Sequence, residues 1–187
     1  VAVEKPEEVT EIILSVPVSQ ANFNPEVLDQ FLRICGSLPD EQLARIVQNI
    51  YKDKWVQLMG KFNHLDFAYQ RICEVLIKAG DFKSILVLAK AIFSVRPEEE
   101  RKAEEKYGFS SDSPFYFNNL SDTKIFESLL KVDSGNLEEA LAITTNAMRE
   151  VIMLSAKDGT DEVFKVYDSF ALYHVDFFNL KLSEKHG

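Results

Sequence analysis

Few residues of this chain are spaced for chemistry. His174 and Asp176 lie two positions apart in a segment with helical periodicity, so their side chains point to different faces and make a poor pair of metal ligands. His64 and His186 have no Cys or carboxylate at ligand spacing. The sequence therefore predicts no metal site.

The segment 158–161, which reads Asp-Gly-Thr-Asp, matches part of a phosphotransfer motif. The apolar strand and second Asp that this chemistry needs are missing, and a helix cap by Asp158 or Thr160 explains the residues better. The sequence also holds no Gly-rich phosphate loop, no Gly-x-Ser-x-Gly turn and no Cys near a His in a catalytic pattern. We therefore predict no catalytic residue and no cofactor, and expect that the protein is not an enzyme.

The charge balance limits the choice of partner. With 30 acidic and 21 basic residues the formal net charge is -9, which repels nucleic acid and anionic lipid surfaces. No apolar run approaches the ~20 residues that a membrane-spanning helix needs. We therefore expect a protein or peptide partner, with no binding to nucleic acid and none to a membrane.

The cysteines bear on the cellular compartment. Cys35 and Cys73 are the 2 cysteines of the chain, and their spacing suits no disulfide framework. This pattern fits a reducing compartment and predicts a cytoplasmic protein in which both thiols are buried. The chain starts at Val1 and enters a helix-start pattern at once, from which we expect a segment of a larger protein, although a processed native terminus would look the same.

Helix-start signals position the first third of the chain. Pro6 and Pro25 are each followed at once by a Glu, and Pro39 by an Asp, which is typical of the first turn of a helix. The expected inward residues are Val9, Ile12 and Ile13 in the first helix, Val27, Leu28, Phe31, Leu32 and Cys35 in the second, and Leu43, Ile46, Val47 and Ile50 in the third.

The rest of the chain also has helical periodicity. Gly80-Asp81 predicts a turn between two antiparallel helices, and Ser134-Gly135-Asn136 predicts another. Because no stretch shows sustained period-two alternation, we expect an all-α fold. The predicted helices are 55–59, 65–79, 82–95, 122–132, 137–156 and 161–182, with a solvated charged helix at 97–106 and an aromatic loop at 108–119.

A positional pattern of aromatic and small residues spans 66–97. It comprises Tyr69, Ile72 and Cys73 in the first helix, Gly80-Asp81-Phe82 at the turn, Ile85, Ala89 and Ile92 in the second helix, and Pro97 at the end. This pattern resembles the tetratricopeptide repeat, a helix-turn-helix unit of about 34 residues. Ile85 and Ile92 replace small residues of the family, which predicts looser helix spacing.

A second unit at 121–152 matches the same family in its turn and second helix. In its first helix Glu127 and Lys131 fall where apolar residues belong, and one extra residue in the turn would bring Phe126 and Leu130 there instead.

The resemblance implies an antiparallel helix-hairpin stack, a tetratricopeptide-like α-solenoid fragment. We expect one helical-repeat domain over 1–187. Its parts are irregular HEAT-like helices at 1–60, a repeat-like hairpin at 61–97, the charged helix and aromatic loop at 98–120, and a repeat-like hairpin with a terminal helix at 121–187.

Repeat stacks expose a curved face that binds peptides and proteins. The family's groove positions fall on Phe67, Gln70, Glu74, Ile77 and Lys78. Packing of Phe67 and Ile77 against the preceding helix around Trp55 explains those two residues equally well. The resemblance thus implies a non-catalytic scaffold or protein-interaction region, whereas a small-ligand-sensing helical domain of a regulator, or an enzyme, would need a closed apolar pocket.

The terminal helix carries aromatic side chains over about half of its circumference, among them Phe170, Tyr173, Phe177 and Phe178. One neighbour cannot cover them all. Phe177 and Phe178 are therefore candidate interface residues of a homo-oligomer; the alternative is that they belong to the internal core.

Overall fold

The computed structural model describes residues 4–16, 24–52, 66–99, 114–116, 120–158 and 170–180. Within these ranges the regular structure is helical, apart from a single antiparallel bridge between Val95 and Phe115. The predicted all-α class is confirmed for this part of the chain. The predicted helix at 55–59 lies outside the described residues.

The first three helices begin where the proline signals place them. They are α1 (Pro6–Ser15), α2 (Pro25–Cys35) and α3 (Asp40–Lys52). Pro occupies the first turn of α1 and of α2, and the Asn24 side chain caps α2 by accepting hydrogen bonds from the backbone N–H groups of Glu26 and Val27. A missing proline N–H costs nothing there, and the cap satisfies two N–H groups that the helix leaves unpaired.

Two expected inward residues are exposed instead. Ile12 is 60% exposed and Val27 is 39% exposed, although the neighbouring residues Ile13 and Leu28 are buried. α1 packs against α3, which covers the stripe of Thr10 and Ile13 and leaves Ile12 on the solvent side. All the expected inward residues of α3 are buried.

The central hairpin consists of α5 (Asp66–Ala79) and α6 (Phe82–Ile92). Gly80 has a φ of 71°, and the N–H groups of Gly80 and Asp81 donate to the carbonyls of Ile77 and Leu76, which closes α5 in a Schellman motif. The Asp81 carboxylate then accepts from the Ser84 N–H at 3.1 Å and caps α6. α6 ends before the predicted Val95, whose backbone is extended and bridges to Phe115.

The predicted helix at 122–132 is split in two. A 3₁₀ turn, η2 (Leu120–Thr123), precedes a short helix, α8 (Ile125–Leu129), and Lys124 between them has a left-handed φ of 58°. The Thr123 hydroxyl bonds to the Leu120 carbonyl and to the Ile125 N–H, which gives the backbone partners outside a continuous helix. A second 3₁₀ turn, η3 (Ser134–Asn136), leads into α9 (Leu137–Asp158).

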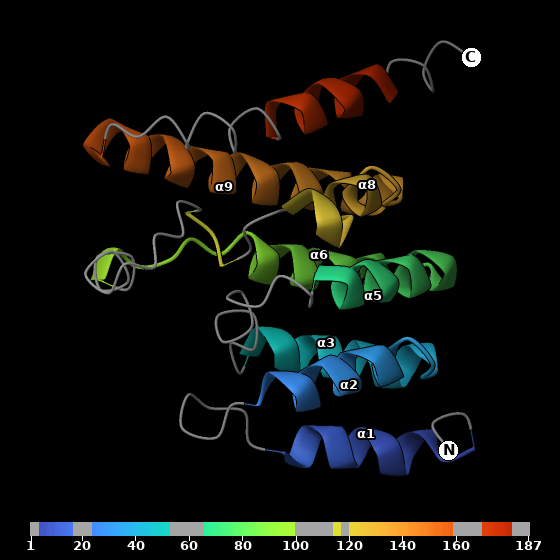
Figure 1. The fold of residues 1–187 in the computed structure, drawn as a ribbon. Helices are drawn as coiled ribbons and strands as arrows, with labels where there is room; N and C mark the ends of the chain where they lie inside the picture. Colours follow the sequence, from blue (N-terminus) through green and yellow to red (C-terminus); the bar gives the residue numbers. More distant parts are fainter. Residues whose placement is uncertain are drawn as a thin grey trace.

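The helices lie in successive layers (Figure 1). α2 contacts α5, and α5 contacts η2 and α8, while α3 contacts α6 and α6 contacts α9. The first helices of the three hairpins thus stack on one another, and so do the second helices. α1 lies below this stack against α3, and the helix at 170–180 lies at the opposite end beside α9 (Figure 1).

An aromatic cluster joins the last layers. The ring of Phe170 lies 5.0 Å from Phe93, 5.1 Å from Phe126 and 5.9 Å from Phe115, measured between centroids. These residues come from the helix at 170–180, the end of α6, α8 and the segment 114–116. Phe115 and Tyr116 are the described aromatics of the predicted loop at 108–119, and both are buried.

The conformation of Gly80 gives a test of the central hairpin. A side chain at this position would meet nothing within 4 Å, so its cost is conformational and not steric crowding. We expect Gly80→Val to lower the free energy of unfolding by about 1 kcal/mol or more, as measured by urea denaturation.

The matched controls are Gly80→Asn, because Asn tolerates a positive φ, and Gly135→Ala at a glycine without a positive φ. Both are expected to stay near the wild-type midpoint. Equal midpoints for Gly80→Val and the wild type would contradict the role of Gly80 in the turn.

Candidate functional site

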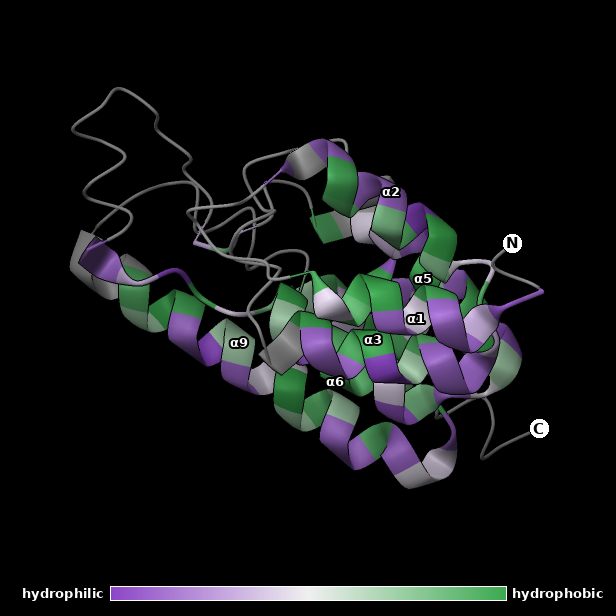
Figure 2. Ribbon diagram, turned by 90° about the horizontal axis from the view of Figure 1, so that it is seen from below, coloured by the Kyte–Doolittle hydropathy of each residue, from purple (hydrophilic) through white to green (hydrophobic). Residues whose placement is uncertain are grey.

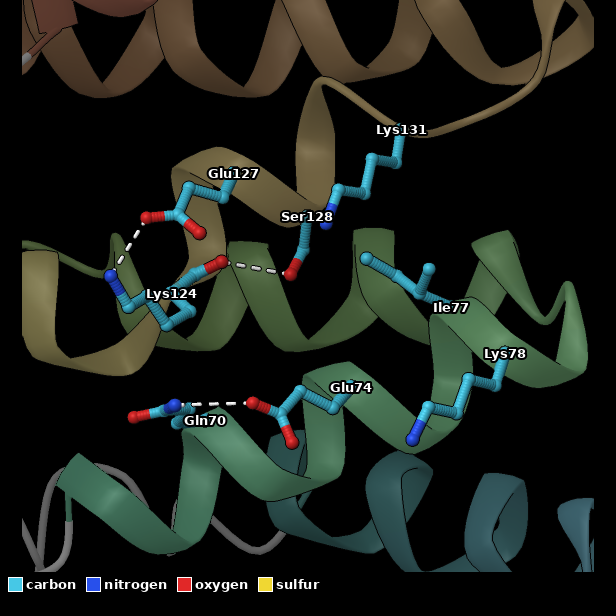
Figure 3. A pocket seen from close by; sticks show the side chains of 8 residues that line it. All are labelled: Gln70, Glu74, Ile77, Lys78, Lys124, Glu127, Ser128 and Lys131. Atoms are coloured by element: carbon cyan, nitrogen blue, oxygen red, sulfur yellow. Dashed lines mark hydrogen bonds and ion pairs between the residues drawn. The ribbon is translucent and has the colours of Figure 1, made fainter.

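A cleft of about 180 Å³ lies between α5 and α8 (Figure 3). Its lining consists of Gln70, Glu74, Ile77 and Lys78 from α5, with Lys124, Glu127, Ser128 and Lys131 from α8 and its flanks. The structure therefore brings together four of the predicted groove residues. The fifth, Phe67, belongs to α5, but its side chain lies outside the described residues.

Helix periodicity places the α5 residues on one side. Gln70, Glu74 and Ile77 follow each other at intervals of four and three residues and share a face. The inward face carries Tyr69, Ile72, Cys73 and Leu76, all fully buried. The core thus fixes how α5 presents its polar face to the cleft.

The α8 side of the cleft contains Glu127 and Lys131, the two residues that depart from the repeat pattern in the first helix of 121–152. Glu127 and Lys131 are exposed and line the cleft, whereas Phe126 and Leu130 pack against the core. Phe126 and Leu130 thus face inward and Glu127 and Lys131 outward. α8 starts directly after Lys124, which has a left-handed backbone.

Ion pairs and side-chain hydrogen bonds are unevenly distributed along the cleft. Gln70 donates to Glu74 at 3.1 Å, and Lys124 pairs with Glu127 at 2.8 Å. Within the described part of the chain, Lys78 and Lys131 form no ion pair. Figure 3 shows these two lysines on the α5 and α8 sides of the same end of the cleft. One end therefore holds matched polar groups, and the other holds two ammonium groups without carboxylates.

Cys73 of α5 and Ser128 of α8 meet where the two helices pack together. The buried Ser128 hydroxyl donates to the Lys124 carbonyl at 2.8 Å and also hydrogen bonds with the thiol of Cys73.

Burial raises the pKa of the Cys73 thiol to about 12, although the hydrogen bond with Ser128 lowers that pKa by a smaller amount. Burial likewise raises the pKa of Cys35 to about 12. The predicted burial of both cysteines is confirmed. Neither thiol is a nucleophile at neutral pH, since the thiolate is the reactive form.

The lining of this cleft supports binding better than catalysis. It contains neither His nor Cys, and its hydroxyl group, on Ser128, is already bonded to a backbone carbonyl. Nucleophilic catalysis by a hydroxyl group needs an activating base within hydrogen-bond reach. What the residues can do is form ion pairs, hydrogen bonds and one apolar contact.

The terminal helix separates the two predicted interface residues. Phe177 is 4% exposed and packs 6.1 Å from Tyr173, so it belongs to the core. Phe178 is 59% exposed. Of this pair, Phe178 alone is placed where a second molecule can reach it.

His174 has a structural partner that its sequence neighbours do not reveal. Its Nε2 lies 3.0 Å from the Thr144 hydroxyl of α9, and that hydroxyl also lies 3.1 Å from the carbonyls of Ala140 and Leu141. The contact joins residues 30 positions apart and holds the terminal helix against α9. Burial lowers the pKa of His174, because it penalises the charged imidazolium.

Among the described residues, no group of three or more His, Cys, Asp or Glu side chains could hold a metal ion. In the same ranges, no helix is both long enough and apolar enough to cross a membrane. Comparisons with protein-family models, curated proteins and solved structures found no match.

The two phenylalanines of the terminal helix give a paired test. We expect Phe177→Glu to unfold the C-terminal layers, because it puts a charge into the core, and Phe178→Glu to leave the helical circular dichroism signal and the melting temperature near wild type. Equal destabilisation by the two changes would contradict the placement of these side chains.

The lowered pKa of His174 gives a pH test. The unfolded chain binds the proton more tightly than the folded chain, so this residue contributes stability above its ordinary pKa of 6.5 that is lost as the pH falls. Denaturation at a series of pH values should show the wild type losing stability relative to His174→Gln below about pH 6.5. A difference between the two proteins that does not vary with pH would oppose this account.

Proposed function

We propose that this chain is a tetratricopeptide-like helical-repeat segment that binds an extended segment of another protein in the cleft between α5 and α8. It acts as a scaffold and not as a catalyst. The observation that carries the proposal is that four groove positions implied by the repeat resemblance, Gln70, Glu74, Ile77 and Lys78, line one cleft.

The order of the helices supports a repeat architecture. First helices α2, α5 and α8 follow one another on one side, and second helices α3, α6 and α9 follow on the other. In such stacks each hairpin buries its apolar surface only against its neighbours. The cleft is formed by two successive first helices, the side that lines the groove in a tetratricopeptide-like stack.

The size of the cleft favours a protein segment over a small ligand. Small-molecule sites enclose roughly 300–1,000 Å³ and are mostly apolar. The cleft has about 180 Å³, and Ile77 is the apolar side chain among its lining residues. This volume suits individual side chains of an extended peptide that continues along the surface.

The charge of the cleft indicates the chemistry of the partner. Lys78 and Lys131 are the cleft lysines without an ion pair among the described residues, so an Asp or Glu of the partner would find both ammonium groups free to bind it. Glu74 and Glu127 already have partners at the other end. We therefore propose an acidic side chain of the bound segment at the lysine end.

The burial of both cysteines as free thiols supports a reducing environment for this activity. We accordingly propose a cytoplasmic location.

Selection from a random peptide library tests the function. We expect selected peptides to be enriched in Asp and Glu. Lys78→Glu combined with Lys131→Glu should weaken their binding by at least about tenfold, which corresponds to about 1.4 kcal/mol, in fluorescence anisotropy.

The matched control is Lys83→Glu. Lys83 is an exposed lysine of α6 that does not line the cleft, so its reversal changes the net charge by the same amount per site without touching the proposed contact. Equal losses of affinity at Lys83 and at the cleft lysines would indicate long-range charge alone. Retention of full affinity by the double variant would reject the cleft as the binding site.

A further inference from the structure

The helix at 170–180 has two apolar faces. Phe170, Tyr173 and Phe177 are buried against the stack. Leu172, Val175 and Phe178 follow each other at intervals of three residues on the opposite side, and they are 64%, 55% and 59% exposed. We call these three residues the end strip.

The helix that carries the end strip has little charge. Asp176 is the charged residue among the exposed positions of this helix, in a chain with a formal net charge of -9. Contiguous exposed apolar side chains on a water-soluble fold mark an interaction site. Because the described helix has a single charged side chain, two copies that meet through it bring few like charges together.

The α1 end of a second copy is a poor partner for the end strip. The exposed side of α1 carries the carboxylates of Glu7, Glu8 and Glu11 around Ile12. Figure 2, which looks onto α1 from below, shows a largely hydrophilic outer face. Glu8 pairs with Lys5, and Glu11 pairs with Arg45. If the α1 end of one copy covered the end strip of another, these two ion pairs and the carboxylate of Glu7 would lose water against apolar side chains. Head-to-tail stacking is therefore unfavourable.

We propose that two copies of this chain associate through their end strips about a twofold axis. The contact is self-complementary, since the same three apolar residues meet on both sides. We place the two helices antiparallel, with Val175 near the axis and Leu172 opposite Phe178 of the second copy. This arrangement opposes the two helix dipoles and sets the largest side chain against a smaller one. The association is independent of the cleft between α5 and α8.

Disulfide trapping tests both the contact and its direction. Cys35 and Cys73 are the 2 cysteines of the chain and both are buried, so an introduced surface cysteine is the accessible thiol. Under mild oxidation Val175→Cys should form a covalent dimer. Leu172→Cys and Phe178→Cys should each cross-link poorly alone and efficiently when the two variants are mixed.

The matched control is Ile12→Cys, which places a cysteine at a similarly exposed apolar position on the other end of the stack and should remain monomeric. Efficient trapping of Leu172→Cys with itself would overturn the antiparallel arrangement. Equal trapping at Ile12 and Val175 would show random collision and overturn the interface.

Sedimentation of the unmodified chain gives an independent test. The strip is small, so we expect a weak dimer with a Kd on the order of 1 mM or below. Val175→Glu should raise that Kd at least tenfold with unchanged helicity, whereas Ile12→Glu should not change it. A wild-type chain that stays monomeric at about 1 mM would overturn the proposal.

Discussion

Burial of the central hairpin on both of its sides is the constraint on which the other layers depend. α5 and α6 have α2 and α3 on one side and α8 and α9 on the other, and Ile72, Cys73 and Ile85 are fully buried between them. A single helical hairpin has no core of its own, so each layer is stable only with its neighbours. The same burial sets the rotation of α5 and therefore decides which of its residues face the cleft.

Side chains distant in sequence hold the far end of the stack. Phe170 contacts rings from the C-cap of α6, from α8 and from the segment 114–116, and His174 bonds to Thr144 of α9. The Tyr173 hydroxyl is buried there without a hydrogen-bond partner among the described atoms, and burial raises the pKa of that phenol. Shape and ring packing thus contribute more to this end than polar pairing does.

Local signals made most helix starts predictable from the sequence. Proline followed by an acidic residue fixes the backbone and complements the helix dipole within a few residues, and Gly80-Asp81 encodes both the end of α5 and the cap of α6. The cleft positions on α5 came from the resemblance to the tetratricopeptide repeat, which also offered Phe126 and Leu130 as inward residues of the later unit. The break between η2 and α8 was not predicted, because the side-chain bonds of Thr123 and the left-handed backbone of Lys124 compete there with helical periodicity. The exposure of Ile12 and the contact of His174 with Thr144 depend on which helix lies opposite, which a single sequence does not reveal.

In the proposed dimer, the charged groups on the outer side of α1 would limit how large an assembly can grow. A stack whose two ends bind each other would form an open filament, because each head-to-tail contact leaves one free binding surface at either end. A stack with one apolar end and one charged end has no such continuation. Once the apolar end is covered, growth would stop, because the charged end would lose water on contact with another copy.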